Sequence, residues 1–374
     1  MPSPLLTPKE TCCGCSACEQ TCPKNCIVMQ EDSEGFLYPM VNEELCVGCG
    51  ACEKACPSLS PNESRRPLKA LAAINKDEEI RRKSSSGGIF TLMAEKVLAQ
   101  GGWVFGAHFN DSWEVVHGKT NRRDELDSYR GSKYVQSRIG SCFAEAEKLL
   151  KEGRFVMFVG TPCQIAGLHH FLGKSYDRLL TVDFICHGVP SPAVWRWYVK
   201  QVAGKLILPR WLYRLFGWAV PIGVIHDVEF RNKQQGWKQY QMLFKSKNGR
   251  EKTCFHWDDT YMKAFLNNYD LRPSCYHCLA KEGRSHSDIT LADFWNVHKV
   301  IDGFDDNKGT SLVLVNSHQG YDFLQDVDCR MQAVDFDDAI QYNPSWSKSY
   351  ELNPKRQEFF YCYKEKFETL VGQV

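Results

Sequence analysis

Eight cysteines near the N-terminus form two sets of four with the same spacing, and each set ends in a proline. The sets are Cys12, Cys15, Cys18 and Cys22 before Pro23, and Cys46, Cys49, Cys52 and Cys56 before Pro57. Each copy has the pattern C-x2-C-x2-C-x3-C-P. Thiolates are ligands of both iron–sulfur clusters and zinc, and three closely spaced thiolates can wrap one corner of a cubane. The doubled run therefore predicts a metal-binding region that requires reduced cysteines.

This spacing is typical of two-cluster bacterial ferredoxins, in which the fourth cysteine of each run binds the other cluster. We therefore expect two [4Fe–4S] clusters. Their ligand sets would be Cys12, Cys15, Cys18 and Cys56 for one cluster, and Cys46, Cys49, Cys52 and Cys22 for the second. Zinc knuckles and disulfides are the alternatives, but a zinc site needs only four thiolates and does not call for a duplicated cysteine–proline signature. The pattern favours a chain that carries electrons.

Four more cysteines are far apart in the sequence but are expected to meet in space. Cys163 follows a strand expected at 154–159, and Cys186 follows a strand expected at 179–185. The two strands and the helix between them form a βαβ unit, which places both cysteines at one edge of a sheet. Cys275 and Cys278 add a C-x2-C pair, so a third [4Fe–4S] cluster is the simplest interpretation.

Zinc on the same four thiolates, or unligated thiols, are the alternatives for this third set. His187 and His277 lie beside these cysteines and are candidate substitutes for one ligand. The remaining cysteines are expected to be core thiols. They are Cys13, Cys26, Cys142, Cys254, Cys329 and Cys362.

A serine- and glycine-rich stretch precedes a helix expected at 89–98. It consists of Ser84, Ser85, Ser86, Gly87 and Gly88. Glycines let a phosphate approach the backbone, serine hydroxyls donate hydrogen bonds, and a helix N-terminus favours negative charge. The basic residues at 81–83 lie just upstream and are further candidates to hold phosphates. The alternative is a serine cap after a flexible loop.

A second loop, residues 130–137, mixes cations, hydroxyls and an aromatic ring. Lys133 and Tyr134 are its candidate contacts to a flavin ring or ribityl chain, and a plain surface loop is the alternative.

The composition excludes several classes of protein. The chain has 374 residues, 18 cysteines and a net charge of +1, so it lacks the basic excess of a nucleic-acid-binding protein. It contains no run of 18 apolar residues that would span a bilayer, and residues 1–8 do not resemble a secretory signal. Because clusters need reduced thiols, we expect a cytoplasmic location.

The elements that must position these residues alternate between strand and helix. Strands are expected at 70–74, 103–109, 154–159 and 179–185, and helices at 89–98, 142–150 and 162–172. Residues 206–254 favour β structure, and residues 57–67 favour a linker. The predicted fold is an α+β dicluster ferredoxin module at 1–62, followed by a mixed α/β flavin-binding iron–sulfur part. That part is expected to divide into domains at 63–140 and 141–374.

Five segments together resemble the coenzyme F420 hydrogenase/dehydrogenase beta-subunit family. They lie in order over about residues 70–300, at 84–88 (SSSGG), 131–137 (GSKYVQS), 160–164 (GTPCQ), 186–191 (CHGVPS) and 288–295 (DITLADFW). The resemblance implies an oxidoreductase with FAD and an additional cubane cluster beside it. The hydrogenase subunit itself lacks an N-terminal dicluster module, so this chain departs from it there.

The implied function is electron transfer between the clusters and FAD, which couples one-electron and two-electron chemistry. Reduced ferredoxin or a partner redox subunit would supply electrons. The acceptor would be a small molecule, either an F420-type deazaflavin or another compound such as one from a polysaccharide pathway. His187 is the predicted proton donor, or else a hydrogen-bond partner of a cluster sulfur. An electron-transfer subunit without its own substrate site, and an iron–sulfur scaffold or sensor, are the other candidates.

Overall fold

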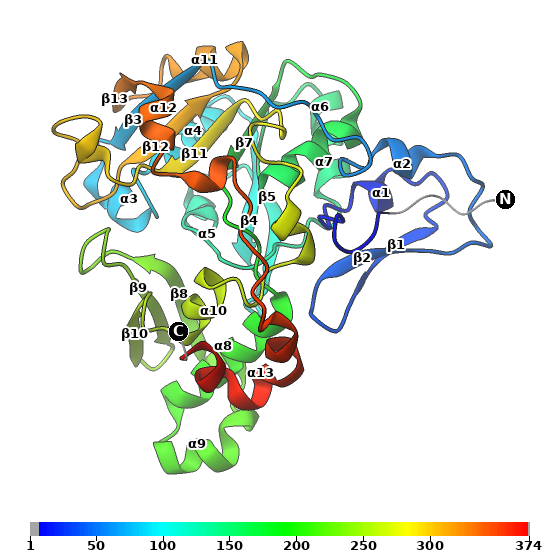
Figure 1. Cartoon of the computed structure of the whole chain (residues 1–374). Coiled ribbons are helices and arrows are strands. Elements are labelled where there is room, and N and C mark those ends of the chain that lie inside the picture. The colour runs from blue at the N-terminus through cyan, green and yellow to red at the C-terminus, as the bar shows by residue number, and fades with distance from the viewer. Residues whose placement is uncertain (1–6, 373–374) are drawn as a thin grey trace.

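A computed structural model describes residues 7–372, apart from the side chains of Arg210, Arg214 and Trp218. Residues 1–6, on which the expectation of no secretory signal mostly rests, lie outside this part. A small N-terminal module packs beside a lobe built on an eight-stranded sheet, and a second lobe combines helices with a three-stranded sheet at one side (Figure 1).

The N-terminal module has the two-fold repetition that its cysteine pattern predicts. Two short helices, α1 (Ala17–Gln20) and α2 (Ala51–Lys54), each follow a residue in the left-handed region, Ser16 at φ 63° and Gly50 at φ 69°. Between them, β1 (Ile27–Glu31) and β2 (Leu37–Val41) form an antiparallel hairpin. Left-handed residues let each cysteine loop reverse sharply before its helix begins.

The segment between the module and the sheet is fastened along its length. Ser58 Oγ donates to Thr11 O at 2.8 Å, and Asn62 Nδ2 donates to Arg284 O at 2.9 Å. Arg65 N donates to Glu282 O at 2.9 Å. The linker predicted from its composition therefore connects two parts of the chain without letting the module swing freely.

The large sheet contains four parallel neighbours at its centre and antiparallel strands at both sides. In order across the sheet, its strands are β13 (Cys329–Val334), β3 (Lys69–Asn75), β12 (Ser311–Val315), β11 (Ile289–Asp293), β7 (Leu179–Phe184), β6 (Val156–Val159), β4 (Trp103–Phe109) and β5 (Val115–Thr120). The expected βαβ unit is confirmed, because β6 and β7 are parallel neighbours on either side of α7 (Pro162–Leu172). Strands from both sides of residue 140 join this one sheet.

Helices cover both faces of the sheet, and strand alternation explains how. On one face, α6 (Cys142–Lys151) and α7 pack on residues such as Phe105 and Phe158. On the other, α4 (Ile89–Ala99) and α11 (His318–Leu324) pack on their neighbours Val104 and Met157. Successive strand residues point to opposite faces, so adjacent residues of β4 and β6 serve two separate cores. The other helices of this lobe are α3 (Glu78–Lys83), α5 (Leu126–Tyr129) and α12 (Phe336–Ile340).

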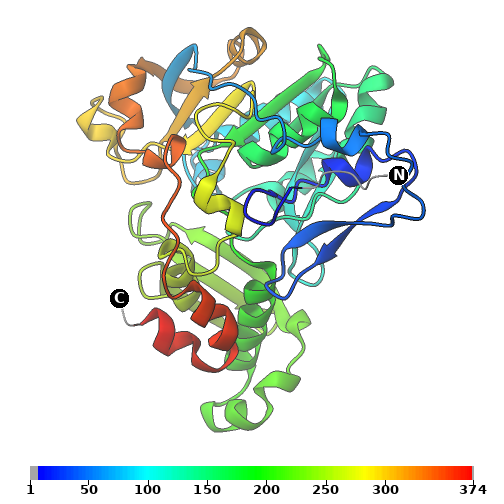
Figure 2. The same cartoon turned by 45° about the vertical axis from the view of Figure 1, so that its right-hand side comes forward.

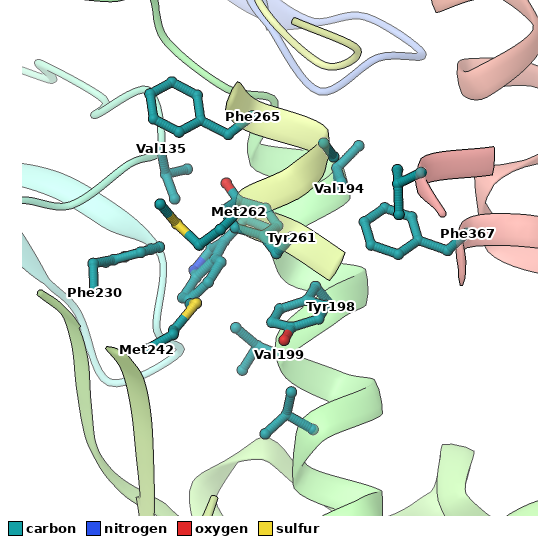
Figure 3. Close-up of a cluster of buried hydrophobic side chains, with 14 of the residues drawn as sticks. Val135, Val194, Tyr198, Val199, Phe230, Met242, Tyr261, Met262, Phe265 and Phe367 are labelled. Carbon is teal, nitrogen blue, oxygen red and sulfur yellow. The ribbon is translucent and has the colours of Figure 1, made fainter. Parts of the chain in front are cut away.

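The second lobe has its own hydrophobic core (Figure 3). Its elements are α8 (Pro192–Ile207), α9 (Arg210–Phe216), β8 (Ile225–Asn232), β9 (Gln241–Ser246), β10 (Glu251–Phe255), α10 (Thr260–Leu266) and α13 (Arg356–Val371). Tyr198 from α8, Tyr261 from α10 and Phe230 from β8 meet in this core, and Val135 enters it from the 130–137 loop. The β structure expected over 206–254 begins only at β8, because α8 and α9 occupy the first part.

None of the helices within residues 7–372 is both long and apolar enough to cross a bilayer.

Candidate functional site

The first cysteine set lines a cavity inside the N-terminal module. Cys12, Cys15, Cys18 and Cys56 line this cavity, and so do Cys13 and Cys52. Burial raises the pKa of Cys18 to about 12, with Cys12 and Cys56 adding to the shift as nearby negative charges. The structure therefore brings together the four thiols expected to form one ligand set, including the distant Cys56. We call this space the inner cavity.

The second set lines another cavity, which we call the outer cavity. Cys22, Cys46, Cys49 and Cys52 all border it, and Cys49 is exposed. Cys26, expected to be a core thiol, also lines the outer cavity, and its sulfur lies 3.3 Å from that of Cys22. The outer cavity is thus the one nearer to solvent.

The third set converges where the strands of the βαβ unit end. Cys163, Cys186, Cys275 and Cys278 line a single space, which we call the third cavity. Cys163 is the second residue of α7, whose start is fixed by a capping box between Thr161 and Gln164. The Val189 N–H points to the Cys275 sulfur at 3.4 Å.

A buried cation accompanies these thiols. Burial raises the pKa of Cys186 to about 11 and that of Cys275 to about 12, whereas Lys281 opposes the shift on Cys186. The Lys281 ammonium donates to Cys186 O and Ser345 O, both at 2.6 Å. A cysteine must ionise in order to bind a cluster, and a positive charge of this kind favours the ionised form.

The ligands of a cubane are spaced differently from those of a single metal ion. Between residues 7 and 372, no group of three or more His, Cys, Asp or Glu side chains is arranged to hold one metal ion. The sulfurs that hold a cubane lie farther apart, at roughly 7 Å, because the cluster itself fills the space between them. His187 borders the third cavity, whereas His277 is exposed and does not line it.

Cys13 connects the inner and third cavities. Its thiol is hydrogen-bonded with Cys15 on one side and Cys163 on the other, and these bonds lower its pKa well below the ordinary value. Cys13 and Ser58 line both cavities. Figure 2 shows the first cluster loop, in dark blue, beside the yellow segment that carries Cys275. Cys13 is therefore not an isolated core thiol, because it lies between two candidate cluster sites.

His187 is held by contacts that oppose proton donation. Its Nε2 bonds Asn268 Oδ1 at 2.7 Å, and its ring stacks on Tyr350 with the centroids 3.8 Å apart. Burial lowers the pKa of His187 to about 4. A neutral imidazole whose N–H is engaged by an amide oxygen fits a role in holding the cavity wall together.

Part of the serine–glycine loop is committed to holding the fold together. The Ser84 hydroxyl donates to Ile80 O at 2.7 Å, and the Ser86 hydroxyl donates to Thr310 O at 2.8 Å. A Cβ added at Gly87 would lie 2.4 Å from Ala73 O, so glycine is required there by contact with β3. The basic residues upstream are also occupied, since Arg81, Arg82 and Lys83 all pair with carboxylates.

The remaining loop residues are available to a ligand. Ser85 Oγ accepts from Ser132 N at 2.7 Å, which leaves the Ser85 hydroxyl hydrogen free to donate. Gly88 is the N-cap of α4, with φ 84°. Lys133 Nζ donates to the carbonyls of Arg130 and Gly131, at 3.1 and 3.3 Å.

Lys133 has no acidic partner among the residues that the structure describes. Desolvation lowers its pKa to about 7. Lys133 is close enough to His108 and His117 to lower their pKa values as well. The buried Nδ1 of His117 has no hydrogen-bond partner in the described structure. A lysine without a carboxylate, next to an unpaired imidazole nitrogen, is suited to receive an anionic or hydrogen-bonding ligand.

Tyr134 is built into the second lobe. Its ring stacks on Phe265 at 4.8 Å and meets Phe230 edge-on at 5.5 Å. Its hydroxyl accepts from Arg231 at 3.1 Å, and Arg231 pairs with Asp293 at 2.8 Å. Of the predicted flavin contacts, Ser85 lies beside the 130–137 loop that carries Lys133, and Gly88 begins α4, while Ser84, Ser86, Gly87 and Tyr134 have other partners.

Two family models match the chain at these sites. Residues 11–59 match the 4Fe-4S dicluster domain, and residues 153–207 match the C terminus of the coenzyme F420 hydrogenase/dehydrogenase beta subunit. The chain is beta-subunit-like, with an N-terminal ferredoxin module. The beta-subunit match begins before β6 and ends with α8, so it contains both Cys163 and Cys186 of the third cavity. The chain is an iron–sulfur protein of an oxidoreductase type.

One solved structure has a distant similarity to the chain. One similar structure is from the F420-reducing [NiFe] hydrogenase complex of Methanosarcina barkeri, at 18% identity and a TM-score of 0.47. The match covers 82% of this chain and 90% of the hydrogenase chain, and it is too distant to support a functional inference. No curated protein matches this sequence significantly.

Sequence reasoning missed the residues that join the cavities. The adjacency of Cys13 to Cys12 was the one available signal, since it adds a thiol beside the ferredoxin pattern. Arg272, which reaches from the third cavity to Cys12, had no such signal. Ser349 had no sequence signal either, although its hydroxyl accepts a hydrogen bond from Cys278 N at 3.0 Å.

Proposed function

We propose that this chain is an iron–sulfur flavoprotein that transfers electrons between ferredoxin-type clusters and FAD, and so reduces or oxidises a small molecule. The observation that carries the proposal is that the inner and third cavities lie next to each other. The third cavity borders the inner cavity, and Cys13 and Ser58 line both. A set of redox sites must be closely spaced to exchange electrons, and this fold places two cysteine-lined cavities side by side.

The residues present fit three [4Fe–4S] clusters. Each cavity is lined by all four cysteines of its own predicted set, and thiolates are the ligands that such clusters require. The chain itself adds two buried cations that line the third cavity, Lys281 and Arg272, and the second of these also contacts Cys12 of the inner cavity. These charges offset the negative charge that thiolate-bound iron brings into the interior.

The residues present fit FAD at the start of α4. Ser85 and Gly88 would offer a hydroxyl and backbone N–H groups to the phosphates, as helix N-termini commonly do. Lys133 retains one ammonium hydrogen beyond its two carbonyl contacts, so it would pair with the same negative charge. FAD would supply the conversion between one-electron and two-electron transfer. His117, with its unpaired Nδ1, would offer a hydrogen bond to the ligand.

The proposed partners follow from the exposure of the outer cavity. Cys49 is exposed, so reduced ferredoxin or a partner redox subunit would exchange electrons there. The small-molecule acceptor is an F420-type deazaflavin or another compound that stacks on a flavin. We assign His187 no proton transfer in this scheme, because Asn268 engages its N–H.

The alternative is an electron-transfer subunit without a substrate site. This alternative is favoured by the loop residues that already have partners within the fold, because they leave fewer groups to bind a flavin. These residues are Ser84, Ser86, Gly87 and Tyr134.

Anaerobic purification, followed by quantification of iron and acid-released flavin, tests the proposal. We expect about 12 iron atoms per chain, four for each of three clusters, and one FAD. About 12 iron atoms without flavin would support the electron-transfer subunit. About eight iron atoms would remove the third cluster from the proposal.

A further inference from the structure

We propose that Arg272 raises the reduction potential of the cluster in the inner cavity, so that an electron settles next to the third cavity and not at the exposed outer site. This inference rests on the proposed function, because it concerns a cluster bound by Cys12, Cys15, Cys18 and Cys56. Arg272 acts through its charge and its hydrogen bonds, and is therefore a positioning residue.

Arg272 lines the third cavity, and its guanidinium contacts Cys12, which lines the inner cavity. Its N–H donates to Val189 O at 3.0 Å, and Cys275 N donates to Arg272 O at 2.9 Å. Its guanidinium donates to Cys12 O at 2.7 Å and to Leu37 O at 2.8 Å. One side chain thus connects the loop of the third cavity to both the first cluster loop and strand β2.

The guanidinium also reaches a predicted cluster ligand. One terminal nitrogen of Arg272 lies 3.7 Å from the Cys12 sulfur, within hydrogen-bond range for sulfur. The other donates to Gln136 Oε1 at 2.9 Å, and Gln136 Nε2 in turn donates to Cys13 O at 3.0 Å. The same network therefore orients Cys12, which lines the inner cavity, and Cys13, which lines both cavities.

No carboxylate neutralises this cation in the part of the chain that the structure describes. The side chain is fully buried, at 0% exposure, and its partners are carbonyl oxygens, an amide oxygen and a sulfur. The face of Tyr38 lies 4.2 Å from the guanidinium carbon. A buried unpaired cation is costly unless a negative group lies nearby, and a thiolate-bound cluster would be such a group.

The local backbone is shaped to admit the guanidinium. Gly14, at φ +68°, passes so close that a Cβ there would lie 2.7 Å from a terminal nitrogen of Arg272. A side chain at position 14 would occupy the place of the guanidinium. The close approach and the left-handed backbone both require glycine at this position.

The charge has a defined effect on redox balance. Reduction adds one negative charge to a cluster, and a fixed cation within hydrogen-bond distance stabilises the reduced form more than the oxidised form. A charge stabilises the reduced cluster strongly where water is excluded, as around Arg272. The same stabilisation would be weaker at the outer cavity, where Cys49 is exposed. An electron shared by the two ferredoxin sites is therefore expected to favour the inner one.

Redox titration followed by EPR tests the inference in the full-length chain. Arg272→Gln removes the charge, whereas Arg272→Lys retains it and serves as the matched control. Cys49→Ser identifies the outer signal. In Arg272→Gln we expect the electron distribution to shift toward the outer cluster by tenfold or more, equivalent to ~59 mV or more for one electron. In Arg272→Lys we expect a smaller change.

An unchanged inner potential in Arg272→Gln, with iron content equal to that of the unmodified chain, would overturn the inference alone. Absence of iron from the unmodified chain would instead overturn the proposed function. If Arg272→Gln fails to fold, pulsed EPR of the reduced, ¹⁵N-arginine-labelled chain gives a second test. We expect a weak ¹⁵N coupling at the inner cluster that Arg272→Lys abolishes. A labelled chain without such coupling would refute the contact.

Discussion

Replacing Gly167 by alanine should disturb the contact between the ferredoxin module and the α/β lobe. Gly167 lies inside α7 and faces the first cluster loop. A Cβ added there would lie 2.8 Å from the Cys15 sulfur and 2.9 Å from its Cβ. Ordinary carbon contacts lie at about 3.5–4.0 Å. The loop or the helix must therefore move by up to about 1 Å, and Cys15 is the residue displaced.

The expected loss of stability is the difference between two terms. Overfilling a packed contact costs about 1–3 kcal/mol. Alanine in place of glycine inside a helix recovers about 0.8–1 kcal/mol. The free energy of unfolding should thus fall by between about 0 and 2 kcal/mol. The effect on the cluster site should be clearer than the effect on stability, because the methyl group contacts a predicted ligand directly.

Thermal unfolding and EPR of the reduced, iron-loaded chain measure both effects. Gly223→Ala is the matched control, since it adds the same methyl group where no other heavy atom lies within 4 Å. We expect Gly167→Ala to alter the inner cluster signal and leave the outer one unchanged, and Gly223→Ala to change neither. If Gly167→Ala matched the control in stability and in both signals, the contact between α7 and the first cluster loop would be wrong.

Three further outcomes are expected. Cys275→Ser should lower bound iron by about four atoms while the ferredoxin signals persist, whereas Cys362→Ser in α13 should lose none; equal iron in both variants would contradict the third cluster. Lys133→Met should lower flavin content yet stabilise the flavin-free chain near pH 7, because it removes a poorly solvated ammonium; retained flavin would exclude Lys133 from the site. The pKa of Lys133 is about 7 in the fold, against an ordinary 10.5, so the unfolded chain binds more protons between these values. The free energy of unfolding of the flavin-free chain should therefore rise with pH over this range, and Lys133→Met should flatten that rise when measured by denaturant titration.

The features predicted correctly from the sequence are those encoded by neighbouring residues. The doubled cysteine spacing predicted the module that the dicluster match confirms. Thr161 and Pro162 predicted the start of α7 correctly, because an N-cap and a proline at the first helical position act locally. The helix α8 was missed, although its buried residues recur at helical spacing, as at Val194, Tyr198 and Val202.

The features missed depend on residues far apart in the chain. The stretch around Gly87 resembles a phosphate-binding loop in the sequence. In the structure, this glycine is required by its contacts with β3 and with Ser311 of β12. The segment after residue 342 gave no signal at all, yet Tyr350 stacks on His187. No local pattern reports a contact of this kind, because it depends on how the chain returns to the cavity.

The long reach of Arg272 sets an order for maturation of the protein. Its side chain closes over the Cys12 loop from 260 positions further along the chain. At typical rates of synthesis, the ribosome needs on the order of tens of seconds to cover that distance. During this interval the first cysteine loop is already made but lacks its cover, and half of the third set of thiols does not yet exist. The ferredoxin clusters could thus be delivered to the nascent chain, whereas the proposed third cluster would require Cys278 to have been added first.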